Sequence, residues 1–210
     1  MGRLIQGIHG PVLGKVGFVS GASWKGLYYI KGPHKKRTAR VSAKEAANRK
    51  KFALSQSWLK PLLKFVRDGF KGYSPPVEGF VAAKSYLLRY AFEGDQPDIR
   101  INPALVRVSY GDLPLSNNIS VRQSEAGKLQ FNWDPARVDG GSQRDQVMLL
   151  AYDIEHAFAY FTTTGQFREN GVDTLRIGSA TGRTYHVYLA FCAADRSRQS
   201  NSVYLGEITS

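Results

Sequence analysis

The hydrophobic and polar positions divide the chain into three zones with different periodicities. The first zone, residues 1–41, is rich in glycine and holds two short apolar stretches, residues 14–20 and 26–30. These stretches predict the strands of one β-hairpin, with its turn over residues 21–25. An isolated hairpin is marginally stable in water, so we expect it to rest either on the remainder of the chain or on a neighbouring molecule.

The second zone, residues 42–95, has helical periodicity and predicts a helical hairpin. Ser42 and Glu45 have the spacing of a capping box, so a helix should begin at about Ala43. Pro61 lacks an amide hydrogen and should kink or restart that helix, and a second antiparallel helix is expected over residues 77–92. The apolar stripe expected on the first helix is Ala46, Phe52, Ala53, Leu54 and Leu59.

The third zone has the pattern of short strands. Residues 96–116 are interpreted as a linker or strand, and residues 117–210 as a β-sandwich. The apolar or alternating stretches that predict its strands are residues 128–133, 146–152, 184–191 and 202–208. The fold class is therefore α+β: a basic amino-terminal β-hairpin arm and a helical hairpin, followed by an all-β sandwich.

Two resemblances refine this prediction. Trp133 at the end of an early strand, and the spacing of Leu175, Ile177, Gly182 and Tyr185, resemble a fibronectin type III or immunoglobulin-like sandwich. This resemblance implies that Tyr185 is the tyrosine of the corner before the penultimate strand.

The whole chain also resembles a Bacteroidetes family of unknown function, family 6266. The stretches that carry this resemblance are Gly7, Gly10, residues 14–17, 24–26, 29–30, 49–53, 59–62 and 69–70. The resemblance implies a bacterial source and no particular activity.

Positive charge is concentrated in the first half of the chain. The formal net charge is +12; residues 1–93 hold 18 Lys and Arg against 4 Asp and Glu, whereas residues 94–210 hold 11 against 13. Such asymmetry favours an acidic partner or surface for the amino-terminal half. The candidate residues of the arm are Arg3, Lys15, Trp24, Lys25, Tyr28, Tyr29, Lys31, Lys35, Lys36, Arg37 and Arg40.

Three binding functions fit this pattern. The first is self-assembly or protein binding through strand addition by the arm, giving a ring, filament or particle. The second is nucleic-acid binding, in which cations neutralise phosphates and aromatic rings stack on bases. The third is a carbohydrate- or surface-binding sandwich that uses Tyr188, Tyr204 and the loop 195–201. Further candidate positions are Arg49, Lys50 and Lys51 on the helix and Arg196 and Arg198 in that loop.

The sequence predicts no enzyme, no metal and no cofactor. The four histidines have no ligand spacing, and the best local cluster, Asp153, Glu155 and His156, is more typical of a solvated loop. Cys192 is the one cysteine, so no intrachain disulfide can form, and its apolar surroundings favour a buried thiol. No stretch predicts a signal peptide or membrane insertion, so we expect a cytoplasmic protein. This expectation does not exclude release from the cell as part of an assembly.

Overall fold

The computed structural model describes residues 3–8, 10–33, 40–72, 79–94, 97–178 and 181–210. The chain divides into two compact units, Met1–Ser42, here called the arm, and Ala43–Ser210, here called the body. This boundary lies one residue from the end of the predicted glycine-rich zone.

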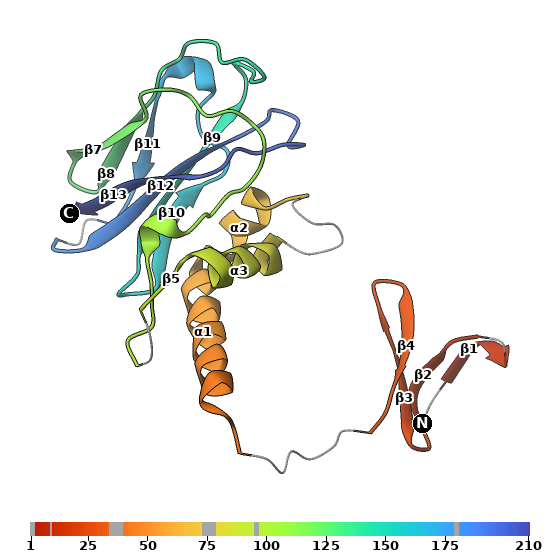
Figure 1. Cartoon of the computed structure of the whole chain (residues 1–210). Helices are drawn as coiled ribbons and strands as arrows, with labels where there is room; N and C mark the ends of the chain where they lie inside the picture. Colours follow the sequence, from red (N-terminus) through yellow and green to blue (C-terminus); the bar gives the residue numbers. More distant parts are fainter. Residues whose placement is uncertain (1–2, 9, 34–39, 73–78, 95–96, 179–180) are drawn as a thin grey trace. The chain divides into compact units, whose positions relative to one another are not determined.

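The arm contains a four-stranded antiparallel sheet rather than one hairpin (Figure 1). Its strands follow each other in the order β1 (Arg3–Ile8), β2 (Val12–Val16), β3 (Val19–Trp24) and β4 (Leu27–Lys31). The predicted turn over residues 21–25 is wrong, because most of it belongs to β3. The chain turns instead at residues 17–18 and 25–26, where Gly17, Lys25 and Gly26 have positive φ angles of 54°, 48° and 84°. Two successive positive φ angles, as at residues 25–26, are what a two-residue type I′ hairpin turn requires.

The sequence predicts that Gly21 lies in a turn, but the structure gives this glycine another role. A Cβ atom at this position would collide with the carbonyl oxygen of Val12, so the glycine allows close approach of β2. Sequence composition alone does not separate a glycine needed for a turn from one needed for close packing.

The helical layer begins where the sequence predicts. It comprises α1 (Ala43–Leu59), a 3₁₀ turn η1 (Lys60–Leu62), α2 (Leu63–Gly69) and α3 (Gly79–Tyr90). Pro61 lies in the first turn of η1, where its missing amide hydrogen costs nothing, so the predicted restart at this proline is confirmed. The observed α3 lies within the predicted range, of which residues 77 and 78 are outside the described part.

The apolar stripe predicted for α1 is largely wrong. Ala46, Phe52 and Ala53 are exposed, and the buried residues of this helix are Ser55, Trp58 and Leu59. The reason is that only the last turns of α1 pack on the core, so its earlier turns have no apolar surface to face. The ring of Phe52 is instead approached by the ammonium group of Lys84, 4.1 Å from the ring centre.

The carboxy-terminal strands form two antiparallel sheets. One has the order β11 (Val172–Arg176), β8 (Lys128–Asn132) and β7 (Ser120–Glu125), and the other has the order β10 (Phe158–Thr162), β9 (Gln146–Asp153), β12 (Thr184–Cys192) and β13 (Val203–Thr209). The four predicted strands are confirmed. The other three were not predicted because two of them, β7 and β11, are short and mostly polar, and β10 follows a loop-like stretch.

The described residues of this half thus build a sandwich of three strands facing four. The fibronectin type III-like assignment stays a prediction. One of its details is not seen: the buried hydroxyl of Tyr185 has no hydrogen bond with any backbone group in the described part of the chain, whereas a corner tyrosine makes one.

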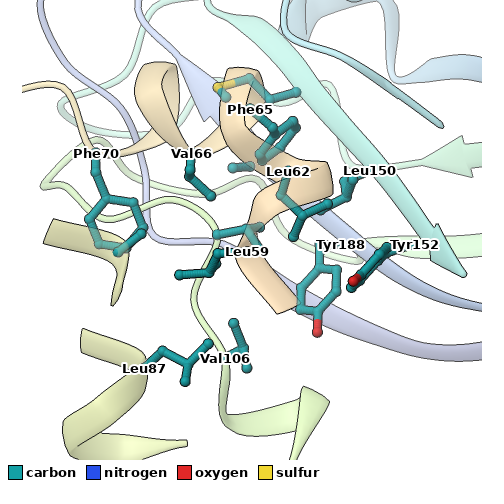
Figure 2. Close-up of a cluster of buried hydrophobic side chains, with 14 of the residues drawn as sticks. Leu59, Leu62, Phe65, Val66, Phe70, Leu87, Val106, Leu150, Tyr152 and Tyr188 are labelled. Carbon is teal, nitrogen blue, oxygen red and sulfur yellow. The ribbon is translucent and has the colours of Figure 1, made fainter. Parts of the chain in front are cut away.

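Two hydrophobic cores lie on opposite faces of the sheet that contains β9 and β12. Alternate residues of β9, Met148, Leu150 and Tyr152, pack toward the helical layer, and the residues between them pack toward the other sheet. Figure 2 shows the helical core, with the labelled residues Leu59, Leu62, Phe65, Val66, Phe70, Leu87, Val106, Leu150, Tyr152 and Tyr188. The predicted segments 42–95, 96–116 and 117–210 therefore share one compact unit.

The segment between helices and sandwich is firmly held. It follows the short strand β5 (Phe92–Glu93) and contains the short strand β6 (Arg100–Ile101) and then the 3₁₀ turn η2 (Pro103–Leu105). Val106 and Val108 are buried, and the hydroxyl of Ser109 donates to the carbonyls of Gly69 and Ser200, at 3.1 and 2.7 Å. The segment thus joins the two layers of the body.

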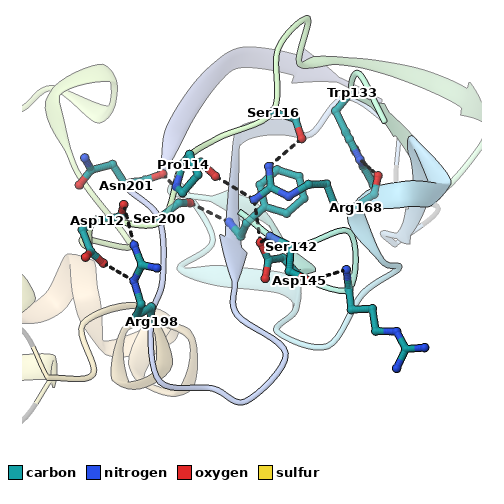
Figure 3. A network of polar contacts seen from close by, with 12 residues as sticks. Asp112, Pro114, Ser116, Trp133, Ser142, Asp145, Arg168, Arg198, Ser200 and Asn201 are labelled. Atoms are coloured by element: carbon teal, nitrogen blue, oxygen red, sulfur yellow. Dashed lines mark hydrogen bonds and ion pairs between the residues drawn. The ribbon is translucent and has the colours of Figure 1, made fainter. Parts of the chain in front are cut away.

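A buried arginine links the loops at one end of the sandwich (Figure 3). Arg168, in the 3₁₀ turn η3 (Arg168–Asn170), donates to the Ser116 hydroxyl at 2.9 Å, the Pro114 carbonyl at 2.8 Å and the Asp145 carboxylate at 3.2 Å. Its guanidinium group also lies 4.1 Å from the ring centre of Phe191. Burial lowers the pKa of Arg168, and the Asp145 carboxylate opposes that effect.

We predict that Arg168→Met destabilises the protein by about 3 kcal/mol, because the carboxylate of Asp145 would stay buried without its cation. Urea unfolding followed by near-ultraviolet circular dichroism measures this loss. Arg176→Met, which removes an exposed arginine from β11, is the control and should change the free energy of unfolding by less than about 0.5 kcal/mol. Equal midpoints for the two variants would show that the network is not stabilising.

Candidate interaction surfaces

The pairing of β3 with β4 fixes which side chains share a face of the arm sheet. Directly opposed residues of antiparallel strands lie on the same face. Trp24 is opposite Leu27, Ala22 is opposite Tyr29 and Ser20 is opposite Lys31. Ser20 is also opposite Lys15 of β2. One face, here called the aromatic–basic face, therefore carries Lys15, Trp24, Leu27, Tyr29 and Lys31.

The other side of the sheet is apolar. Gly21 is opposite Ile30, Ser23 is opposite Tyr28, and Val16 is opposite Val19. This side, here called the apolar face, carries Val16, Val19, Tyr28 and Ile30, and none of the four is a charged residue.

Among the described residues of the arm, large hydrophobic side chains are exposed on both faces of the sheet. The exposed large hydrophobic side chains of β2, β3, β4 and the turn at Phe18 are Val16, Phe18, Val19, Trp24, Leu27, Tyr28, Tyr29 and Ile30. Phe18, in the turn between β2 and β3, is 88% exposed. A sheet needs a second layer on at least one face to gain stability from burial, and clustered apolar side chains in contact with water mark an interaction surface.

Lysines lie over the aromatic rings of the aromatic–basic face. The ammonium group of Lys25 is 5.5 Å from the ring centre of Trp24, and that of Lys31 is 5.9 Å from Tyr29. These distances are within the range of a cation–π attraction. The arrangement keeps positive charge beside open ring faces.

The structure brings together some of the predicted arm residues and separates others. Lys15, Trp24, Tyr29 and Lys31 share one face, whereas Tyr28 lies on the other. The side chain of Arg3 and the residues Lys35, Lys36 and Arg37 are outside what the structure describes, and Arg40 is exposed. Sequence reasoning missed Phe18. This residue follows Gly17 between two valine-containing strands, which is the pattern of a hairpin tip.

The cations predicted on the helix face each have a contact within the body. Arg49 pairs with Glu45 at 2.8 Å, Lys50 donates to the carbonyl of Pro97 at 2.5 Å, and the ammonium group of Lys51 lies 5.6 Å from the ring centre of Phe92. Each of these three cations thus has a partner within the body.

The predicted recognition loop is held against the sandwich by its own arginines. Arg196 donates to the Thr163 carbonyl at 2.6 Å and to the side chain of Gln146. Figure 3 shows Arg198, which pairs with Asp112 at 3.0 Å. Tyr188 is fully buried, and its hydroxyl donates to the carbonyl of Pro103 at 2.7 Å. A buried ring cannot stack on a sugar, so Tyr188 is removed from the candidate carbohydrate surface.

The cluster around Asp153 is arranged about one buried carboxylate. The buried carboxylate of Asp153 lies 2.8 Å from Nδ1 of His156 and 3.5 Å from the guanidinium group of Arg183, while Glu155 is exposed. Within the described ranges, no three His, Cys, Asp or Glu side chains are placed to hold a metal ion. Cys192 is buried, and burial raises the pKa of its thiol.

A model of the family described as "Family of unknown function (DUF6266)" matches residues 10–206, nearly the whole chain. The chain belongs to this family. The matched range begins before β2 and ends within β13, so the DUF6266 pattern includes strands of the arm as well as the body. Among curated proteins, no match to the chain is found.

Among the residues that the structure describes, no helix combines the length and the apolar character needed to cross a bilayer.

We predict that the stability of this DUF6266 protein decreases as the pH falls below 6.5, partly through His186. Its Nδ1 lies 3.0 Å from the Tyr204 hydroxyl and 3.6 Å from Glu207. Burial lowers the pKa of His186 from 6.5, and Glu207 and Asp153 oppose the effect with their negative charge. The stability due to the neutral imidazole is therefore complete above pH 6.5 and is lost as the pH falls through the lowered pKa.

Urea midpoints measured between pH 7.5 and pH 5 test this prediction. His186→Gln keeps a hydrogen-bond acceptor for Tyr204 but does not titrate, so its midpoint should fall less than that of the wild type. Parallel pH profiles for the two proteins would exclude a contribution from His186.

Proposed function

We propose that this protein is a non-catalytic assembly protein that self-associates through its arm. The observation that carries the proposal is the sheet β1–β4, which exposes large hydrophobic side chains on both faces. Burying the apolar face against another molecule would supply the second layer that such a sheet needs.

The edge of the sheet supports the same proposal. β4 ends the described strand order, so one of its edges has no strand beside it within the described residues. All five residues of β4 are exposed. An open strand edge flanked by apolar side chains is suited to pairing with another chain through backbone hydrogen bonds.

Charge supports association between unlike surfaces of identical chains. Residues 1–41 contain eight Lys and Arg and no acidic residue, whereas residues 94–210 have a net charge of −2. Contact between a basic arm and a mildly acidic surface of a second copy is heterologous, and repetition of a heterologous contact generates a ring or a filament.

We predict that Tyr28→Ser with Ile30→Ser, both on the apolar face, converts the assembly to a monomer. Removing two large side chains from a buried interface should weaken association by at least about 100-fold. Light scattering coupled to size-exclusion chromatography at micromolar concentration gives the mass. The matched control, Leu27→Ser with Tyr29→Ser, alters the other face and should leave the assembly intact. A wild-type protein that is monomeric under these conditions contradicts the proposed function.

The aromatic–basic face supports a second candidate function, the binding of single-stranded nucleic acid. Lys15 and Lys31 share this face with Trp24 and Tyr29, which combines phosphate-binding cations with rings on which bases can stack. This candidate uses the face that the assembly proposal leaves free.

For the second candidate we predict that Lys15→Gln with Lys31→Gln weakens binding of a single-stranded oligonucleotide. The slope of the logarithm of affinity against the logarithm of salt concentration should decrease by about 1.4, because two phosphate contacts are lost. Fluorescence anisotropy measures both quantities. Lys60→Gln with Lys64→Gln removes the same charge from the body and should leave the slope unchanged. Absence of binding by the wild type at low salt would eliminate this candidate.

A further inference from the structure

Three polar residues form a row across the aromatic–basic face of the arm. Ser20 of β3 is paired with Lys15 of β2 on one side and with Lys31 of β4 on the other. Directly opposed residues of antiparallel strands point their side chains to the same face. The Ser20 hydroxyl therefore lies between two lysines that leave the same side of the sheet.

These three residues border a hollow of about 340 Å³. The rest of its lining consists of Gly17, Phe18, Gly32 and Pro33. Both lysines are exposed, and the ring of Phe18 is 88% exposed. The hollow thus combines two cations, one hydroxyl group and one accessible aromatic ring.

The lysines of the hollow have no carboxylate of the arm to pair with. Residues 1–41 contain no Asp or Glu. Among the described residues, neither Lys15 nor Lys31 forms an ion pair, and the Ser20 hydroxyl makes no hydrogen bond. Two strand spacings separate the lysine backbones by about 10 Å. Two uncompensated cations at this separation favour an anion between them.

The rings near the hollow indicate what carries the anion. Lysine is a common ligand of phosphate groups, and a serine hydroxyl can donate to a phosphate oxygen. Phe18 borders the same hollow, and Tyr29 and Trp24 continue the aromatic–basic face beyond it. A carboxylate would use the cations alone, whereas a nucleotide would also place its base on a ring. The combination therefore favours nucleic acid over an acidic protein segment.

We infer that the hollow holds the phosphate backbone of a single-stranded nucleic acid between Lys15 and Lys31, with a neighbouring base on Phe18. The inference rests on the second candidate function and adds Ser20 and Phe18 to its interface. The contact lies on the aromatic–basic face, so it leaves the apolar face available for assembly.

Two aspartate variants of the full chain test the position of the phosphate. Ser20→Asp places a carboxylate between the two lysines, where it neutralises them and repels phosphate. Ser23→Asp places the same charge on the opposite face of the same strand and is the control. Fluorescence anisotropy of a labelled oligothymidylate should show binding at least about tenfold weaker for Ser20→Asp, and a change of less than about twofold for Ser23→Asp.

Two alanine variants test the position of the base. Phe18→Ala removes the ring, and Val19→Ala shortens the next side chain along the strand, which belongs to the apolar face. Loss of one stacking contact should weaken oligonucleotide binding about tenfold for Phe18→Ala. Its salt dependence should equal that of the wild type, because no charge is removed. Val19→Ala should bind as the wild type does, and circular dichroism establishes that all four variants are folded.

The possible outcomes separate this inference from the functions on which it builds. Equal losses in Ser20→Asp and Ser23→Asp would show that only net charge matters and would overturn the inference. Equal affinities of Phe18→Ala and Val19→Ala would overturn it as well. In both cases the wild type still binds, so the second candidate function stands. A wild type that binds vesicles of phosphatidylglycerol but not the oligonucleotide overturns both. The mass from light scattering tests the assembly function independently of these measurements.

Discussion

Strands β9 and β12 are covered on both faces, and this constraint determines how the body is built. One set of their side chains requires the helical layer, and the alternate set requires the three-stranded sheet. Removing either layer would expose a row of large apolar residues of this sheet to water. The segment 106–110 and the buried Arg168 add polar links between elements that this double burial already holds together.

The sheet of the arm, unlike β9 and β12, is not covered on both faces by the described residues. Its four strands pair through backbone hydrogen bonds, but the described side chains of β2, β3 and β4 leave large hydrophobic groups exposed on both faces. The body obtains its core from its own sequence, whereas the arm carries apolar residues without a covering layer described beside them. This contrast in burial is the physical basis for assigning interaction to the arm rather than to the sandwich loops.

The sequence predicts the body better than the arm, for reasons that particular residues show. The apolar run of residues 146–152 predicts a strand, and its residues from Val147 to Tyr152 are all buried in the observed β9. Pro61 predicts the helix restart because it has no amide hydrogen to donate. Gly21 misled the prediction of the arm, since a glycine needed for close packing has the same appearance as a turn glycine. The partners of Arg196 and Arg198 could not be predicted either, because they lie 33 to 86 residues away in the chain.

The two faces of the arm also explain why charge alone could not decide between partners. Lys31 of β4 lies on the face that carries Leu27 and Tyr29, whereas Tyr28 and Ile30 alternate to the opposite face. A basic, aromatic composition is therefore compatible with a sheet that offers cations to one partner and an apolar layer to another. The strand register, rather than the composition, separates the two surfaces.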